Sequence, residues 1–331
     1  MSEPTIAILV TFRNMDGPVL GNFIKRSEGT AGAPRYVRFE RLHFDDANLP
    51  AMLKQQVAQV PADTRLKLFV SGHGGVGIDY ITDHTRTVKR TVPELATLLT
   101  QALRDRAGNA AQSGRTEVNM LSCLFGRTTD GQASSSPAAR LFAALLSAGV
   151  FVELVGRTES ILAMRDGRYT MPELNFVANV PNYGKHPSFS APKRPYSKIR
   201  WARESGQTVA YIAAYSSDKR MIRSDSPEGQ RILWADYAVN CLIKLIERSG
   251  KPPEVRIVGE RAKALEHIIM LYDTIPSPEQ LRARLSGLVD GTGEDDASNF
   301  LRHRNPVHAA LSTGLPKKAA EIERLLTCYP G

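Results

Sequence analysis

The chain is poor in cysteine and lacks any long apolar run. Only three cysteines occur among its 331 residues, namely Cys123, Cys241 and Cys328. They lie far apart and match no metal-ligand spacing, which argues against a disulfide framework and predicts a reducing compartment. No window approaches the roughly 18 to 20 uncharged apolar residues that a membrane-spanning helix needs, so a transmembrane span is not expected.

The first residues also lack the features of a secretory signal peptide. An acidic residue, Glu3, and no basic residue precedes the short apolar run at 5–12. A Sec signal carries positive charge in front of its apolar core. We therefore expect this run to be a first strand. The protein is expected to be cytoplasmic, or to be delivered into a target cell by a route other than Sec.

Acidic residues are too few to balance the basic ones. The chain has 43 Lys and Arg against 34 Asp and Glu, a formal net charge of +9. The surplus gathers in one acid-free stretch that contains Lys185, Lys193, Arg194, Lys198, Arg200 and Arg203. Interleaved aromatic residues would let such a stretch follow a nucleic-acid strand. No nucleic-acid motif accompanies it, so we expect a solvated loop or an edge that faces an acidic partner.

The first 180 residues alternate strand-like and helix-like segments. Apolar or alternating runs predict strands at 5–12, 35–44, 65–72, 116–123 and 150–157, the second nearer an edge. Helical spacing predicts helices at 49–60, 92–106 and 136–149. Thr91 and Ser136 are the expected N-caps. This alternation predicts an α/β fold, with a mostly parallel sheet sandwiched by helices.

The composition divides the chain into three expected parts. Residues 1–180 form an α/β domain, and residues 181–204 form a basic, proline-rich connecting segment. Residues 205–331 form a mainly helical subdomain, with one more strand near 208–218.

The glycine-rich loop after the third predicted strand matches a nucleotide-binding motif only in the spacing of its glycines. Gly72, Gly74 and Gly77 have the spacing G-x-G-x-x-G. In a dinucleotide site a helix begins within this loop, and its amides meet the pyrophosphate. Residues 78–90 are instead β-branched and polar without helical periodicity, and no Gly-Lys-Ser/Thr follows. We therefore expect no cofactor here, and no metal site in the chain.

His73 and Cys123 each lie where a predicted strand ends in a loop. Parallel sheets place their chemistry in such loops, and strands that are consecutive in sequence are often neighbours. The two side chains could therefore meet at one edge of the sheet. A buried structural role is the commoner fate of a free cysteine, and it suits Cys241 and Cys328 within their helices better. Among the other histidines, His84 is the strongest competitor to His73.

The blocks LKLFVSGHGG (66–75) and VNMLSCLFG (118–126) resemble those of the clan CD cysteine peptidases. This group includes caspases, legumains, clostripain, gingipains, separases and the autoprocessing domains of bacterial toxins. The resemblance spans about 5–160. The caspase pentapeptide around the cysteine is absent, so the similarity is to the bacterial clostripain-like and toxin-protease branches rather than to caspases proper. It implies a caspase-hemoglobinase-like sheet and a cysteine endopeptidase that serves as a bacterial effector or a regulatory protease.

The resemblance also implies roles for individual residues. Cys123 would be the nucleophile and His73 its acid/base partner. The backbone N–H groups of Gly74 and Cys123 would form the oxyanion hole. A third residue that orients His73 is not selected, since Asp79 and Asp83 are both close in sequence.

Substrate specificity and regulation follow from the resemblance only in outline. The substrate pocket would include Arg13, Asn14, Arg157, Thr158 and Glu159. Cleavage after a basic residue is the expectation, as in many bacterial relatives, and an anion such as inositol phosphate is the expected type of activator. Two alternatives remain open. One is a non-catalytic interaction module on the same fold, and the other is a cysteine-dependent acyltransferase or deamidase.

Overall fold

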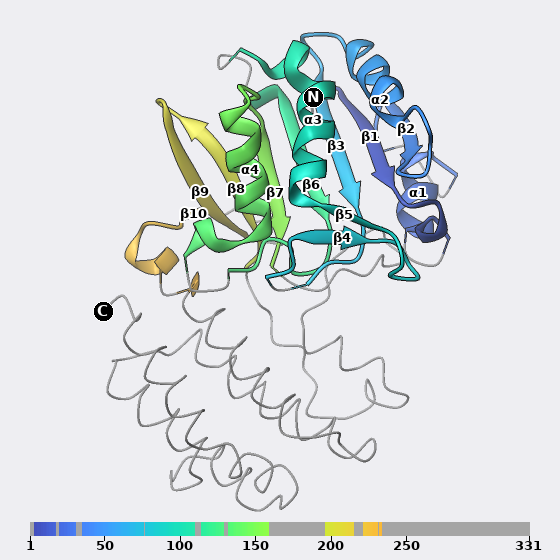
Figure 1. The fold of residues 1–331 in the computed structure, drawn as a ribbon. Helices are drawn as coiled ribbons and strands as arrows, with labels where there is room; N and C mark the ends of the chain where they lie inside the picture. Colours follow the sequence, from blue (N-terminus) through green and yellow to red (C-terminus); the bar gives the residue numbers. More distant parts are fainter. Residues whose placement is uncertain are drawn as a thin grey trace, which may run out of the picture. The chain divides into compact units, whose positions relative to one another are not determined.

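The predicted strands of the N-terminal half come together in one central sheet (Figure 1). The computed structural model describes residues 3–17, 20–30, 35–75, 77–109, 114–128, 132–158, 196–214, 221–230 and 232–233. The chain divides into two compact units, and the first comprises Met1–Thr129, Ala133–Met171 and Pro195–Ser224. Nearly all described residues belong to this first unit. The helical subdomain expected at 205–331 lies mostly outside the described residues.

The sheet has eight strands in the order β10-β9-β8-β7-β6-β3-β1-β2. Their bounds are β1 Thr5–Thr11, β2 Arg38–His43, β3 Arg65–Ser71, β6 Thr116–Leu121, β7 Glu153–Arg157, β8 Tyr196–Glu204, β9 Gln207–Ala214 and β10 Met221–Arg223. Strands β2, β1, β3, β6 and β7 run parallel, and β8, β9 and β10 pair antiparallel. The predicted mostly parallel α/β sheet is therefore confirmed, as is the edge position of β2.

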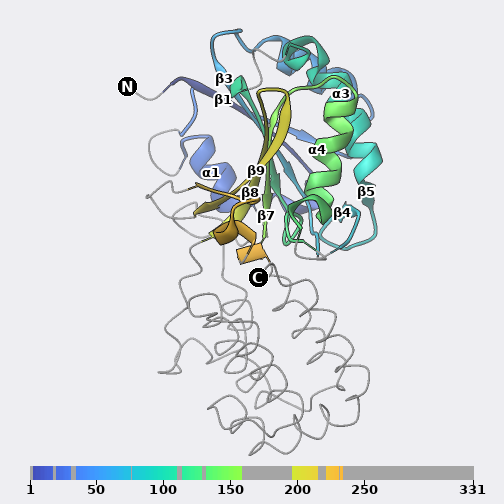
Figure 2. The ribbon, with the colours of Figure 1, turned by 90° about the vertical axis from the view of Figure 1, so that its left-hand side faces the viewer.

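Helices cover both faces of the sheet (Figure 2). Helix α1 (Gly21–Ser27) lies on one face, where Phe23 packs edge-on against Phe69 of β3 with ring centroids 5.2 Å apart. Helices α2 (Leu49–Ala58), α3 (Val92–Ala107) and α4 (Pro137–Ser147) lie on the other. Consecutive residues of a strand point to opposite faces, and Ile8, Leu9 and Val10 of β1 are all fully buried. Burial on both faces explains why β1 reads as a near-continuous apolar run.

The helix starts follow the predicted capping residues. The Thr91 hydroxyl accepts from the backbone N–H of Glu94, whose carboxylate accepts in return from the Thr91 backbone N–H at 2.7 Å. The Ser136 hydroxyl accepts from the Ala139 N–H at 3.1 Å. Both predicted N-caps are confirmed, because a side-chain oxygen satisfies a first-turn N–H that has no helical partner.

Residues 181–204 were expected to form a basic connecting segment, as a solvated loop or an edge, and their last nine residues form β8 between β7 and β9. Ile199 and Trp201 are buried there, with relative exposures of 0% and 2%. Their alternation with Lys198 and Arg200 gives the strand one apolar side and one basic side, so burial of the apolar side overrides the unfavourable overall charge. The strand expected near 208–218 is confirmed as β9, and the expected boundary at 204/205 falls in the turn between β8 and β9.

A short hairpin, β4 (Tyr80–Thr82) and β5 (Lys89–Thr91), follows the glycine-rich loop. Among the described residues of that loop no helix begins, in line with the expectation from residues 78–90. Within the described residues, no helix is both long enough and apolar enough to cross a membrane.

Candidate functional site

The register of β3 and β6 brings the histidine and cysteine loops to the same edge of the sheet. Ser71, the last residue of β3, is paired with Leu121, the last residue of β6. The Ser71 hydroxyl also donates to the Leu121 carbonyl at 3.1 Å. His73 and Cys123 each follow two residues beyond this pair. Both side chains are half-buried, as a site between core and solvent requires.

Gly74 shows how closely the two loops approach each other. A Cβ placed on Gly74 would lie 2.3 Å from the Ser122 Oγ and 2.8 Å from the Cys123 carbonyl oxygen. Real Cβ atoms do not come this close to other heavy atoms, so only glycine fits at this position. The backbone after His73 therefore lies directly against the backbone that carries Cys123.

His73 is held by a strand-like pairing with β4. The His73 N–H donates to the Thr82 carbonyl at 2.8 Å, and the Thr82 N–H donates to the His73 carbonyl at 2.9 Å. This antiparallel bridge fixes the backbone of His73 although β3 ends before it. It also places the residues after Thr82 next to the His73 ring.

The turn between β4 and β5 is organised by Asp83. One carboxylate oxygen accepts from the backbone N–H groups of Thr87 and Val88, at 2.8 and 3.0 Å. The other accepts from the Thr85 hydroxyl at 2.5 Å and from the Asn14 amide at 2.8 Å. Burial would raise the pKa of Asp83, but these hydrogen bonds outweigh it and hold the pKa well below its usual range.

The His73 ring contacts a second imidazole. Its Nε2 lies 3.3 Å from the Nδ1 of His84, and the ring centroids are 5.6 Å apart. Burial lowers the pKa of His73, with further lowering by His84 and Arg86, whereas Asp83 raises it. His73 is therefore largely neutral at neutral pH, the form in which an imidazole accepts a proton from a thiol.

Asn14 connects the end of β1 to this histidine loop. Besides donating to Asp83, its side-chain oxygen accepts from the His84 backbone N–H at 3.1 Å. The neighbouring Arg13 turns away to an ion pair with Asp46, 2.7 Å between Nη2 and Oδ1, and its side chain is 63% exposed. For both residues, contact with substrate stays a prediction. The structure shows that Asn14 holds the histidine loop against the end of β1.

The cysteine turn is attached to β7. The Gly126 N–H donates to the Arg157 carbonyl at 2.7 Å, and a Cβ on Gly126 would lie 2.5 Å from the carbonyl carbon of Gly156. Leu124 in this turn has a left-handed backbone, with φ of 58°. The turn therefore redirects the chain sharply after Cys123 and packs directly on the neighbouring strand.

Arg157 and Thr158 are buried at the end of β7, with relative exposures of 4% and 2%. The Arg157 guanidinium donates to the Asn119 side-chain oxygen at 3.3 Å. The predicted contact of Arg157 with substrate stays a prediction, and Glu159 lies outside the described residues.

Among the candidates for orienting His73, Asp79 forms an ion pair with Arg140 instead.

A charged network lies beside Arg157 on alternate positions of β3, β6, β7 and β8. Arg65 bridges Glu117 and Glu153, at 2.9 and 3.1 Å, and Arg200 pairs with Glu153. Burial and the neighbouring Arg157 lower the pKa of Lys198 to about 8. From the sequence these β8 cations were expected in a solvated loop or on an edge that faces an acidic partner, whereas Arg200 is partnered by Glu153 of the neighbouring strand β7.

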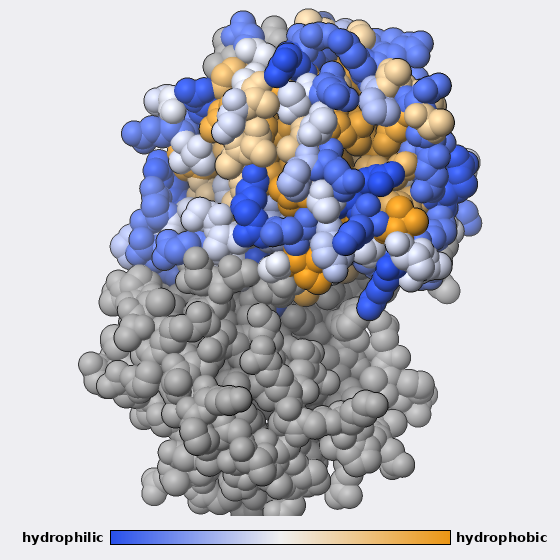
Figure 3. Space-filling model, viewed as in Figure 1, coloured by the Kyte–Doolittle hydropathy of each residue, from blue (hydrophilic) through white to orange (hydrophobic). Residues whose placement is uncertain are grey.

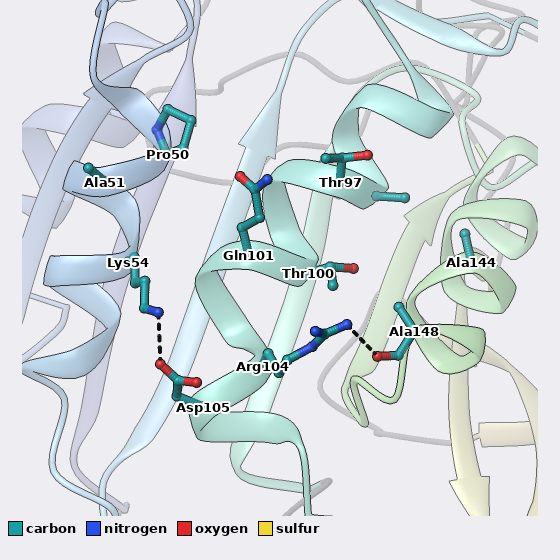
Figure 4. Close-up of a pocket in the computed structure, with 11 residues that line it drawn as sticks. Pro50, Ala51, Lys54, Thr97, Thr100, Gln101, Arg104, Asp105, Ala144 and Ala148 are labelled. Carbon is teal, nitrogen blue, oxygen red and sulfur yellow. Dashed lines mark hydrogen bonds and ion pairs between the residues drawn. The ribbon is translucent and has the colours of Figure 1, made fainter.

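A groove of about 750 Å³ lies elsewhere, on the helical face. It is lined by residues of α2, α3 and α4, where small residues such as Ala144 leave space between the helices (Figure 4). Across the groove, the Lys54 ammonium of α2 forms an ion pair with the Asp105 carboxylate of α3, 3.1 Å between Nζ and Oδ2. Apolar surface shows between the charged side chains on this face (Figure 3). None of the lining residues belongs to the loops that carry His73 or Cys123.

In the part of the chain that the structure describes, no three His, Cys, Asp or Glu side chains are grouped as a metal site. Comparison with known proteins finds no matching family model and no matching curated protein.

Proposed function

We propose that the protein is a cysteine peptidase in which Cys123 and His73 form the catalytic dyad. The observation that carries the proposal is the paired end of β3 and β6, where Ser71 faces Leu121 and both functional residues follow at the same distance. The contact of Gly74 with the Cys123 backbone supports it further, because it brings the two loops into direct contact. The clan CD resemblance of the two blocks supplies the reaction class.

The chemistry needs a thiolate and an acid. A free thiol has a pKa of about 8.5, so only a small fraction is ionised at neutral pH without help. His73, neutral because of its lowered pKa, takes the proton from the Cys123 sulfur as sulfur attacks the peptide carbonyl carbon. It returns that proton to the nitrogen of the leaving amine when the C–N bond breaks. Water then hydrolyses the thioester, which releases the acid product and restores the thiol.

The negative charge that develops on the carbonyl oxygen needs fixed donors. The Gly74 and Cys123 N–H groups are the proposed pair, and each such donor typically contributes about 100- to 1,000-fold in rate. Glycine at 74 lets the backbone that carries one of these N–H groups lie directly against the cysteine loop. The substrate preference for a basic residue, an anionic activator and a role as effector or regulator belong to the same proposal.

The test is labelling of the full chain by an acyloxymethyl ketone peptide probe, with and without inositol hexakisphosphate. We expect the probe to modify Cys123 in the wild type and to leave the Cys123→Ala protein unlabelled at position 123. In His73→Ala, modification of Cys123 is expected to be at least tenfold slower. Cleavage of a peptide library then separates hydrolysis from acyl transfer or deamidation. Equal labelling of Cys123 in wild type and His73→Ala would instead favour the non-catalytic interaction module.

A further inference from the structure

A second histidine lies at the candidate site and has no part in the dyad. Because Thr82 is bridged to His73, the chain returns past the His73 ring and presents His84 two residues later. The Nε2 of His73 and the Nδ1 of His84 are 3.3 Å apart. The ring planes are inclined by 33° with centroids 5.6 Å apart, and the two nitrogens are within hydrogen-bonding distance of each other.

The two aspartates near His73 in sequence are committed elsewhere. Asp79 is paired with Arg140. Both carboxylate oxygens of Asp83 accept hydrogen bonds from its own turn and from Asn14. Asp83 therefore acts on His73 through its charge, and the atom in contact with the ring is a nitrogen of His84.

We propose that His84 is a positioning residue, which accepts a hydrogen bond from the Nε2–H of His73 and so directs the Nδ1 of His73 toward the Cys123 thiol. The inference rests on the dyad proposed above. When the Cys123 proton moves to Nδ1, His73 becomes an imidazolium whose Nε2–H still points at the unprotonated Nδ1 of His84. His84 gains and loses no proton in the cycle, and the proton on Nδ1 leaves with the amine product.

This arrangement has a distinctive response to acid. A contact between two ring nitrogens needs one proton and one lone pair, so it is lost when both rings are protonated. The charged groups that act on His73 are His84 and Arg86, which disfavour its protonation, and Asp83, which favours it. The acid limb of Cys123 reactivity is therefore expected to follow the protonation of His73, the base that takes the thiol proton, and burial lowers the pKa of His73 below its usual value.

The substitution His84→Asn retains an acceptor, because Asn Oδ1 is as many bonds from Cα as His Nδ1. His84→Leu has the same shape as the Asn variant but no acceptor. His84 is exposed and its anchoring bond to Asn14 uses its backbone N–H. The turn is held by Asp83, so both variants are expected to fold like the wild type, which unfolding midpoints check.

The experiment measures alkylation of Cys123 by iodoacetamide in the full chain from pH 4 to 9, with the modified peptide identified by mass spectrometry. His84→Leu is expected to react about 2- to 10-fold more slowly at pH 7, as fits the loss of one hydrogen bond. His84→Asn is expected to stay within about twofold of the wild type, because its acceptor replaces that bond.

The outcomes separate the two proposals. If His84→Leu matches the wild type in rate while His73→Ala is slowed, the dyad stands and the role of His84 is refuted. If His73→Ala also matches the wild type, both are refuted. Side-chain ¹⁵N NMR gives a measurement without substitutions. At neutral pH the His73 Nε2 signal is expected to be that of a protonated ring nitrogen and the His84 Nδ1 signal that of an unprotonated one, and the opposite assignment would overturn the inference.

Discussion

The most direct test of the site's architecture is the substitution Gly74→Ala. The added methyl would lie 2.3 Å from the Ser122 Oγ and 2.8 Å from the Cys123 carbonyl oxygen. Ordinary contacts of this kind begin near 3.4 Å, so one loop must move by about 1 Å. The nearer obstacle is on a short buried side chain and the other is backbone, so neither can yield easily. We expect a loss of about 1 to 3 kcal/mol in the free energy of unfolding, typical of an overpacked site.

The effect on reactivity should exceed the effect on stability. A displacement of 1 Å between reacting groups can lower the rate by about 100-fold. Probe labelling of Cys123 in Gly74→Ala is therefore expected to fall by about that factor, in protein that still unfolds cooperatively. Urea unfolding and labelling kinetics on the same samples give the two values.

Gly75→Ala is the matched control. Its methyl would meet only the Cδ1 and Cγ1 atoms of Ile78, at 2.6 and 3.4 Å, and this flexible side chain can rotate away. Stability and labelling should therefore stay close to the wild type. If Gly74→Ala and Gly75→Ala behave alike, the two loops do not approach each other as described and the proposed site is wrong.

Two further predictions concern β8. Trp201→Ala should lower the free energy of unfolding by about 3 to 5 kcal/mol, because it removes a large buried side chain. Thr208→Ala, at an exposed position of β9, should change it by about 0.5 kcal/mol or less. Equal effects of the two substitutions in urea unfolding would contradict the place of β8 in the core. The pKa of Lys198, about 8, lies below its usual 10.5, so the unfolded chain binds more protons between these values and stability should rise with pH there. Lys198→Met should abolish that rise and stabilise the protein at pH 7 by on the order of 1 to 3 kcal/mol, and parallel stability curves from pH 7 to 10.5 would refute this.

The parts of the fold that sequence could predict are those with local causes. Helix α3 begins directly after Thr91 because a capping side chain, an early proline and Glu94 all lie within four residues. Strand β1 was predictable because burial on both faces makes it a near-continuous apolar run. The adjacency of β3 and β6 followed from their order in the chain, and with it the meeting of the loops that carry His73 and Cys123.

The missed features depend on contacts between distant residues. Strand β8 carries basic side chains whose partners, such as Glu153, belong to other strands. Strands β4 and β5 have only three residues each and too little pattern to be recognised. The contact of His73 with His84 depends on the bridge to Thr82. Sequence proximity pointed to Asp79 and Asp83, but it could not show that their carboxylates are already occupied.

The close contact of Gly126 with Gly156 gives the proposed nucleophile a second support. Two backbones meet there without intervening side chains, so the loop that bears Cys123 cannot shift independently of β7. The sulfur's position is consequently sensitive to the twist between two neighbouring strands, and a bulky residue inside β7 could disable the thiol without touching it. A strand interior thus acts as a remote determinant of reactivity.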